Sequence, residues 1–148
     1  MVTVHRIYPV LYSTDVARAR DFYTTHFDFE VTFDSDWYAS LRHRRNTDHE
    51  LAIIDSSHAS IPAGSRDRVS HLLLNIEVDD ATAEAERLRQ TGAEIVQELR
   101  DEDFGQRHLI VAAPDGVLVD VIEEIPPSPE FAAMFATPSE TTSRAPSP

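Results

Sequence analysis

Six aromatic side chains lie on extended, β-branched stretches of this sequence or on the loop before one. They are Tyr8, Tyr12, Phe33, Trp37, Tyr38 and Phe104. Because successive side chains of a strand point to opposite faces, Tyr8 and Tyr12 share a face, whereas only one of Trp37 and Tyr38 can line a given cavity. A tyrosine joins an apolar ring to a polar tip, which suits a pocket for a flat, partly polar molecule. The competing interpretation is that these rings fill the core or a subunit interface.

Histidines supply the second kind of reactive group. The segment DEDFGQRHLIV places Phe104 on a loop that could close over a ligand, and His108 on the strand that follows. Histidine titrates near neutral pH, so His108 or His71 could act as a metal ligand or a general base. Cysteine is absent, which excludes thiolate ligands and cysteine nucleophiles. The sequence also contains no nucleophile elbow, P-loop or dinucleotide fingerprint.

The elements that would position these residues occur twice. Residues 10–31 (VLYSTDVARARDFYTTHFDFEV) and 74–95 (LNIEVDDATAEAERLRQTGAEI) share one order: an apolar extended run, an Asp, an amphipathic helix, a break and a β-rich run. Helical spacing of apolar residues predicts helices near 15–26 and 80–90. Alternation predicts strands near 6–13, 28–34, 36–44 and 48–55, and again near 70–78, 93–98, 106–112 and 117–123. Each half is therefore expected to be β-α-β-β-β.

Composition limits the partners. The net charge of −13 over 148 residues argues against nucleic acid, whose phosphates require clustered basic residues, and against an anionic membrane surface. No apolar run is long enough to span a bilayer. The first ten residues lack the basic and apolar regions of a signal peptide, so we expect a cytoplasmic protein.

The chain is expected to divide into one domain and an appendage. Residues 1–124 form the domain, with halves 5–55 and 69–124 joined by a polar connector that contains Gly and Pro. Residues 125–136 (IPPSPEFAAMFA) predict a short helical arm behind prolines, and the Ser-, Thr- and Pro-rich residues 137–148 predict a disordered tail.

The doubled β-α-β-β-β unit, with the phrases DFYTTHFDFEV, LLLNIEVDDATAEAERLRQTGAEIV and APDGVLVDVIE, resembles the vicinal oxygen chelate superfamily over about residues 5–124. This superfamily contains glyoxalase I, extradiol dioxygenases, fosfomycin-modifying enzymes and bleomycin-resistance proteins. The resemblance implies an α+β fold in which paired βαβββ modules form a curled mixed sheet around a cavity, with the helices outside. It also implies a homodimer. It does not choose among the chemistries of the family, because one scaffold hosts many functions.

The resemblance also implies where metal ligands would lie. The family's four positions fall near Tyr8, on Glu50, near Leu73 and on Asp120. Two carboxylates are therefore present, but Tyr and Leu stand where His or Gln is expected, and a catalytic divalent metal normally needs three or four protein ligands. A shifted set of Glu50, His71 and Asp120 could still bind Fe, Mn, Ni or Zn. The alternative is that both carboxylates are solvated or paired with arginines.

Two functions follow from these residues. The first is a metal-free small-molecule binding protein of the bleomycin-resistance type, which sequesters an aromatic or cationic compound in a cavity associated with its dimer. The second is a metal-dependent glyoxalase-like lyase or isomerase, or an extradiol-type dioxygenase, with an unusual ligand set. Metal-free acid–base catalysis by Glu50, Asp120 or His108 is a third possibility. We expect the ligand to contact Tyr8, Tyr12, Trp37, Tyr38, Arg42, Glu50, Phe104, His108 and Asp120.

Overall fold

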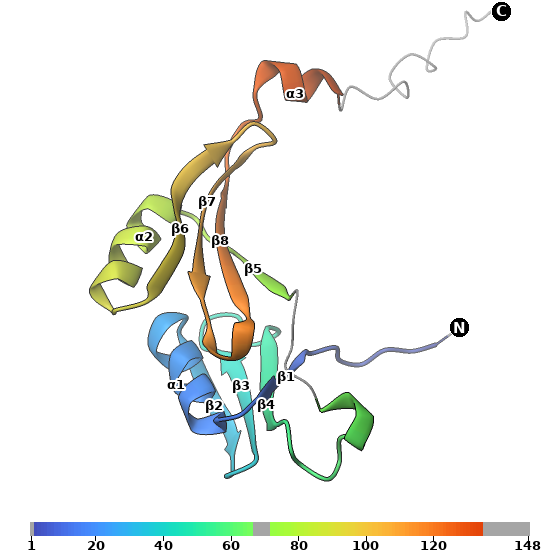
Figure 1. Cartoon of the computed structure of the whole chain (residues 1–148). Coiled ribbons are helices and arrows are strands. Elements are labelled where there is room, and N and C mark those ends of the chain that lie inside the picture. Colours follow the sequence, from blue (N-terminus) through green and yellow to red (C-terminus); the bar gives the residue numbers. More distant parts are fainter. Residues whose placement is uncertain (1, 67–71, 135–148) are drawn as a thin grey trace, which may run out of the picture.

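The computed structural model describes residues 2–66 and 72–134, which form two halves with the same order of elements (Figure 1). The first half contains β1 (Val10–Ser13), α1 (Val16–His26), β2 (Phe29–Asp34), β3 (Tyr38–His43) and β4 (Glu50–Asp55). The second half contains β5 (Leu73–Glu77), α2 (Ala81–Gln90), β6 (Glu94–Glu102), β7 (Gln106–Ala112) and β8 (Leu118–Glu124). Short 3₁₀ turns lie at Ala63–Ser65 and Pro114–Gly116, and α3 (Pro129–Met134) follows the last strand. The predicted α+β class with paired βαβββ modules is confirmed.

The strands form two mixed four-stranded sheets with equivalent topology. The strand orders are β1-β4-β3-β2 and β5-β8-β7-β6. In each sheet the first strand of the module pairs in parallel with the last, and the remaining neighbours are antiparallel. The repeat in the sequence is therefore a repeat of topology, in which each half builds its own sheet.

Both helices begin at an aspartate and cover one face of their sheet. The Asp15 carboxylate accepts a hydrogen bond from the backbone N–H of Arg18 at 3.0 Å, and Asp80 accepts one from Ala83 at 2.9 Å. These bonds satisfy backbone donors that the first helical turn leaves unpaired. Each helix buries one stripe against the strands: Val16, Ala19 and Tyr23 on α1, and Ala81, Ala85 and Leu88 on α2.

A single buried cluster joins the two halves on the helix side. It includes Leu41 and Ile53 from the first sheet and Leu109 and Val121 from the second, each at most 1% exposed. Alternate residues of the same strands point to the opposite face, which we call the helix-free face. On that face, large apolar side chains stay exposed: Val10, Phe33, Leu73 and Leu118 are 37–52% exposed.

The boundaries of two strands differ most from the prediction. The first strand begins at Val10 rather than near residue 6, since Pro9 has no N–H and the partner strand begins only at Glu50. Tyr8 therefore lies on an extended segment before β1. By contrast, β6 continues to Glu102 rather than ending near residue 98, because it stays paired with β7 as far as the contact between Glu102 and Gln106.

The predicted helical arm contains α3 and is fastened to the turn between β6 and β7. In that turn Gly105 has a φ of 100°, and an added Cβ would lie 2.8 Å from the Ile125 carbonyl oxygen. The Ser128 N–H donates to the Asp103 carbonyl at 2.8 Å. Residues 137–148 lie outside the described residues. Within the described residues, no helix has the length and apolar character needed to cross a bilayer.

Candidate functional site

Most of the predicted ligand residues of the first half share its helix-free face. Tyr12 on β1 pairs with Ile54 on β4, which pairs in turn with Tyr38 on β3. Arg42 on β3 pairs with Glu50 on β4. Tyr8 precedes Val10 by two positions and continues the same row. The face exists because the other side of these strands is committed to α1 and the core.

The aromatic residues of this face form a connected group. The ring of Tyr38 lies 6.2 Å from that of Phe33 and 5.5 Å from that of Trp37, centroid to centroid. Trp37 also stacks on His58 at 3.8 Å with an interplanar angle of 10°. Trp37 precedes β3 instead of lying within it, so strict strand alternation does not separate it from Tyr38. We call Tyr8, Phe33, Trp37 and Tyr38 the aromatic wall.

Glu50 meets a partner that sequence inspection did not single out. The Arg6 guanidinium donates to the Glu50 carboxylate from Nε at 2.8 Å and from Nη2 at 2.7 Å. The same guanidinium carbon lies 4.9 Å from the centre of the Tyr8 ring. Arg42, although opposite Glu50 in register, donates instead to Glu30 at 2.7 Å. Partial burial, together with the neighbouring Tyr8, raises the pKa of the Tyr38 hydroxyl.

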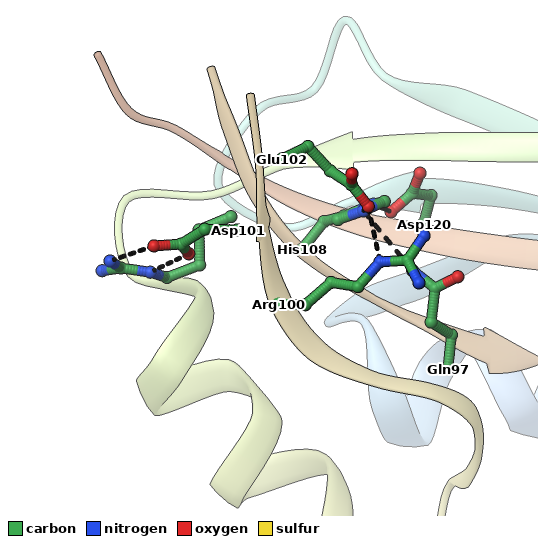
Figure 2. A network of polar contacts seen from close by, with 7 residues as sticks. Gln97, Arg100, Asp101, Glu102, His108 and Asp120 are labelled. Carbon is green, nitrogen blue, oxygen red and sulfur yellow. Dashed lines mark hydrogen bonds and ion pairs between the residues drawn. The ribbon is translucent and has the colours of Figure 1, made fainter. Parts of the chain in front are cut away.

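The second half carries a buried polar network on its helix-free face (Figure 2). His108 on β7 contacts Asp120 on β8 through Nδ1 at 2.8 Å and Glu102 on β6 through Nε2 at 3.0 Å. Arg100 donates to the same Glu102 oxygen, and the Gln97 amide nitrogen lies 3.4 Å from His108 Nε2. The side chains of His108 and Asp120 are only 8% and 7% exposed.

The charges of this network favour a protonated imidazole. Burial is the largest single effect and disfavours the charged form, but hydrogen bonds and charge from Glu102 and Asp120 together outweigh it, so the pKa of His108 is raised. Conversely, the hydrogen bond from His108 and the one from Arg100 lower the pKa of Glu102. The imidazole is therefore held between two carboxylates that favour its charged form.

Phe104 lies apart from both groups. It occupies the three-residue turn after β6, where its ring is 6.2 Å from that of Phe131 on α3. The structure therefore brings it to the helical arm and not to the network around His108.

A cavity of about 600 Å³ opens between the two halves. Its lining combines apolar side chains, such as Phe27, Phe29 and Leu74, with polar ones that include Glu50 and Glu77. Such a volume accommodates a drug-sized molecule. Glu50 is therefore shared between the cavity and the helix-free face of the first sheet.

Glu50 and Asp120, which hold two of the family's ligand positions, each contact a protein partner. Glu50 is engaged by Arg6 and Asp120 by His108, and residues 2–66 and 72–134 contain no cluster of three His, Asp or Glu with ligand geometry. Leu73, at another of the family's ligand positions, has no donor atom in its side chain. His71, the third member of the shifted ligand set, lies outside the described residues.

Comparison with known proteins identifies the family. The sequence profile of the Glyoxalase/Bleomycin resistance protein/Dioxygenase superfamily matches residues 5–121. The chain belongs to this superfamily, as the sequence resemblance predicted. A search of curated protein sequences found no match to this chain.

Solved structures share the fold at low sequence identity. TioX from Micromonospora sp. ML1 is 21% identical, with a TM-score of 0.65, over 82% of this chain and 100% of that one. TnmS3, described as an antibiotic binding protein from Streptomyces sp. CB03234, is 23% identical, with a TM-score of 0.63, over 84% and 98%. A glyoxalase/bleomycin resistance protein/dioxygenase from Nocardioides is 19% identical, with a TM-score of 0.64, over 84% and 87%. At these identities the likeness concerns the fold alone.

Proposed function

We propose that this protein binds a small aromatic or cationic compound without a metal, in a site completed by a second copy of the chain. The observation that carries the proposal is the first sheet's helix-free face, where the aromatic wall remains exposed beside a carboxylate. Phe33 is 52% exposed, Tyr8 39% and Trp37 37%. Exposed aromatic groups of this size commonly mark a binding surface.

The aromatic wall suits a flat ligand. Offset or edge-on contacts between rings contribute roughly 0.5–1.5 kcal/mol each beyond the burial of area. Tyr8 and Tyr38 also offer hydroxyl groups, which can orient a ligand that carries polar substituents. Three such contacts contribute at most about 4.5 kcal/mol, so micromolar binding, which needs about 8 kcal/mol, also requires the burial of apolar area.

Internal cations support the metal-free proposal. Arg6 contacts one oxygen of Glu50 and His108 contacts one oxygen of Asp120, so a metal would compete with an existing partner at each carboxylate. Displacing His108 from Asp120 would also leave the buried imidazole without one of its two carboxylate partners. The alternative enzyme function therefore has to overcome a competing partner in each half.

The second copy is inferred from exposed apolar area. Val10, Leu73 and Leu118 continue the helix-free faces beyond the aromatic wall and are 37–46% exposed. A homodimer would cover these side chains and enclose the ligand. Light scattering after size exclusion would test this, and a monomeric mass at micromolar concentration would contradict it.

The antibiotic-binding description of TnmS3 supports one class of compound. That protein shares the fold but only 23% of its sequence, so its ligand is not transferred to this chain. We propose a role in sequestering an antibiotic or similar secondary compound. The cytoplasmic location stays a prediction from the sequence.

The decisive test uses phenanthridine, a flat aromatic probe, with calorimetry and the fluorescence of Trp37. We expect saturable micromolar binding, and the Tyr38→Ala variant should bind about fivefold more weakly because one ring contact is lost. Val31→Ala is the matched control, since Val31 is 41% exposed on β2 but pairs with Leu41, a residue of the opposite face. Absence of binding, or equal weakening in both variants, would contradict the aromatic wall as the site.

Metal content gives an independent test. Elemental analysis followed by titration with Fe, Mn, Ni and Zn should find no stoichiometric site. Stoichiometric binding that is abolished by both Glu50→Gln and Asp120→Asn would instead support the metal-dependent enzyme.

A further inference from the structure

Arg6 occupies an unusual position for a residue outside any strand or helix. It lies on the extended segment 2–9, upstream of β1, yet its guanidinium makes two contacts with Glu50 at 2.7 and 2.8 Å. It also covers the Tyr8 ring at 4.9 Å. One cation is thus held between a carboxylate and an aromatic face.

This combination is the geometry that recognises organic cations. An aromatic face attracts a cation through its quadrupole, and a carboxylate adds direct charge attraction. The face of Tyr8 and the carboxylate of Glu50 remain a complete cation site whichever cation occupies it. Tyr38, whose pKa is raised in part by the adjacent Tyr8, extends the aromatic side of the site.

Arg6 is held loosely enough to exchange. Its side chain is 61% exposed, while Glu50 is 23% exposed. Its segment has few packing contacts, since Val2, Val4 and Ile7 are 82%, 58% and 85% exposed. Exposed ion pairs and exposed cation–aromatic contacts are individually weak. A competing cation therefore needs only a small gain in binding free energy to displace Arg6.

The segment that carries Arg6 also forms part of the cavity wall. Ile7 and Pro9 line the cavity of about 600 Å³, and Glu50 borders it. Tyr8, between Ile7 and Pro9, has Arg6 over its ring. Because Glu50 both lines the cavity and holds Arg6, the cation site adjoins space for an apolar body.

We propose that Arg6 is an internal stand-in for the ligand's cationic group. The ligand carries an ammonium, pyridinium or guanidinium group that replaces Arg6 between Glu50 and Tyr8, and its apolar body enters the adjoining cavity. The inference rests on the proposed function and adds that the ligand is positively charged. Arg6 acts as a tethered competitor that admits cations strong enough to displace it.

The test compares two probes that differ in charge. N-methylphenanthridinium carries a permanent charge, whereas phenanthridine has almost the same shape and is neutral at pH 7.5. Arg6→Ala removes the competitor, so we expect it to bind N-methylphenanthridinium about fivefold more tightly than the wild-type protein does. Its affinity for phenanthridine should be unchanged. Calorimetry at one fixed ionic strength measures all four affinities.

Arg45→Ala is the matched control. It removes the same charge from a side chain that is 89% exposed and 3.9 Å from its nearest carboxylate, that of Asp28. Any long-range gain from greater negative charge would appear in this variant too, so Arg45→Ala should leave both affinities unchanged. Spectral shifts of the Arg6 Nε–H on adding N-methylphenanthridinium to the wild-type protein would report the displacement directly.

Four results would overturn the inference. Weaker cation binding by Arg6→Ala would make Arg6 a supporting residue instead of a competitor. Equal tightening for both probes would indicate steric blocking without charge selection. Binding of both probes with no effect of Arg6→Ala would support the proposed function but exclude replacement of Arg6 by the ligand. If neither protein binds either probe, the proposed function fails as well.

Discussion

The two halves have the same topology but treat their carboxylates differently. In the first, Glu50 is 23% exposed and its partner Arg6, 61% exposed, comes from outside the sheet. In the second, Asp120 is 7% exposed and its partner His108, 8% exposed, comes from the adjacent strand. A duplicated fold thus presents one carboxylate that can exchange its partner and one that is fixed in the sheet.

The difference in burial determines how much free energy each ion pair contributes to stability. Exposed ion pairs contribute about 0–1 kcal/mol, because solvent screens them and side-chain ordering opposes them. A buried pair costs several kcal/mol when one partner is removed, since the other is left without compensation. We therefore assign recognition to the first half and structural support to the second.

The largest expected effect is on stability when Asp120 is truncated. Asp120→Ala leaves His108 Nδ1 buried without its partner, so we expect a loss of about 3 kcal/mol of unfolding free energy. Glu50→Ala should lose less than about 1 kcal/mol, because its pair with Arg6 is exposed. Urea denaturation of both variants measures the contrast, and similar losses would remove the distinction between the halves.

A smaller effect concerns pH and follows from the raised pKa of His108. A group whose folded pKa exceeds its unfolded value, about 6.5 for histidine, stabilises fully below that value and loses its contribution as pH rises through the folded pKa. The unfolding free energy of the wild-type protein relative to His108→Gln should therefore fall as the pH rises above about 6.5.

The groups that face His108 are Glu102 and Arg100 on β6 and Asp120 on β8. Urea denaturation across the pH range tests the relation, with NMR titration of the imidazole as a direct control. A difference that grows with pH would show that burial, which alone lowers the pKa, dominates over the two carboxylates.

The sequence predicted the elements well because their signals are local. Asp15 and Asp80 precede the helices and cap them, and alternation placed Tyr12 and Tyr38 on strands that turn out to share a face. The family resemblance then supplied the pairing of the modules. The helix caps and the strand alternation depend on neighbours within a few residues, so they can be read directly from the sequence.

The partners of the carboxylates were not predicted, because they depend on contacts between distant segments. Arg6 precedes the first strand and gave no periodic signal, yet it reaches Glu50 at the start of β4. The sequence prediction ends this strand near residue 98, which leaves Glu102 outside it. Alternation extended to Glu102 would place Glu102 and Arg100 on one face. Gln97 joins that face only because the pairing with β7 shifts register between Gln97 and Arg100, which alternation does not predict.

The most direct test of the division between the halves is the affinity for N-methylphenanthridinium of Glu50→Gln and Asp120→Asn, each combined with Arg6→Ala so that Arg6 does not compete. Both substitutions remove one negative charge with little change of shape. Calorimetry under conditions where both variants are folded should show binding weakened about fivefold by Glu50→Gln and unchanged within error by Asp120→Asn. Equal weakening, or a larger effect at Asp120, would contradict the assignment of recognition to the first half.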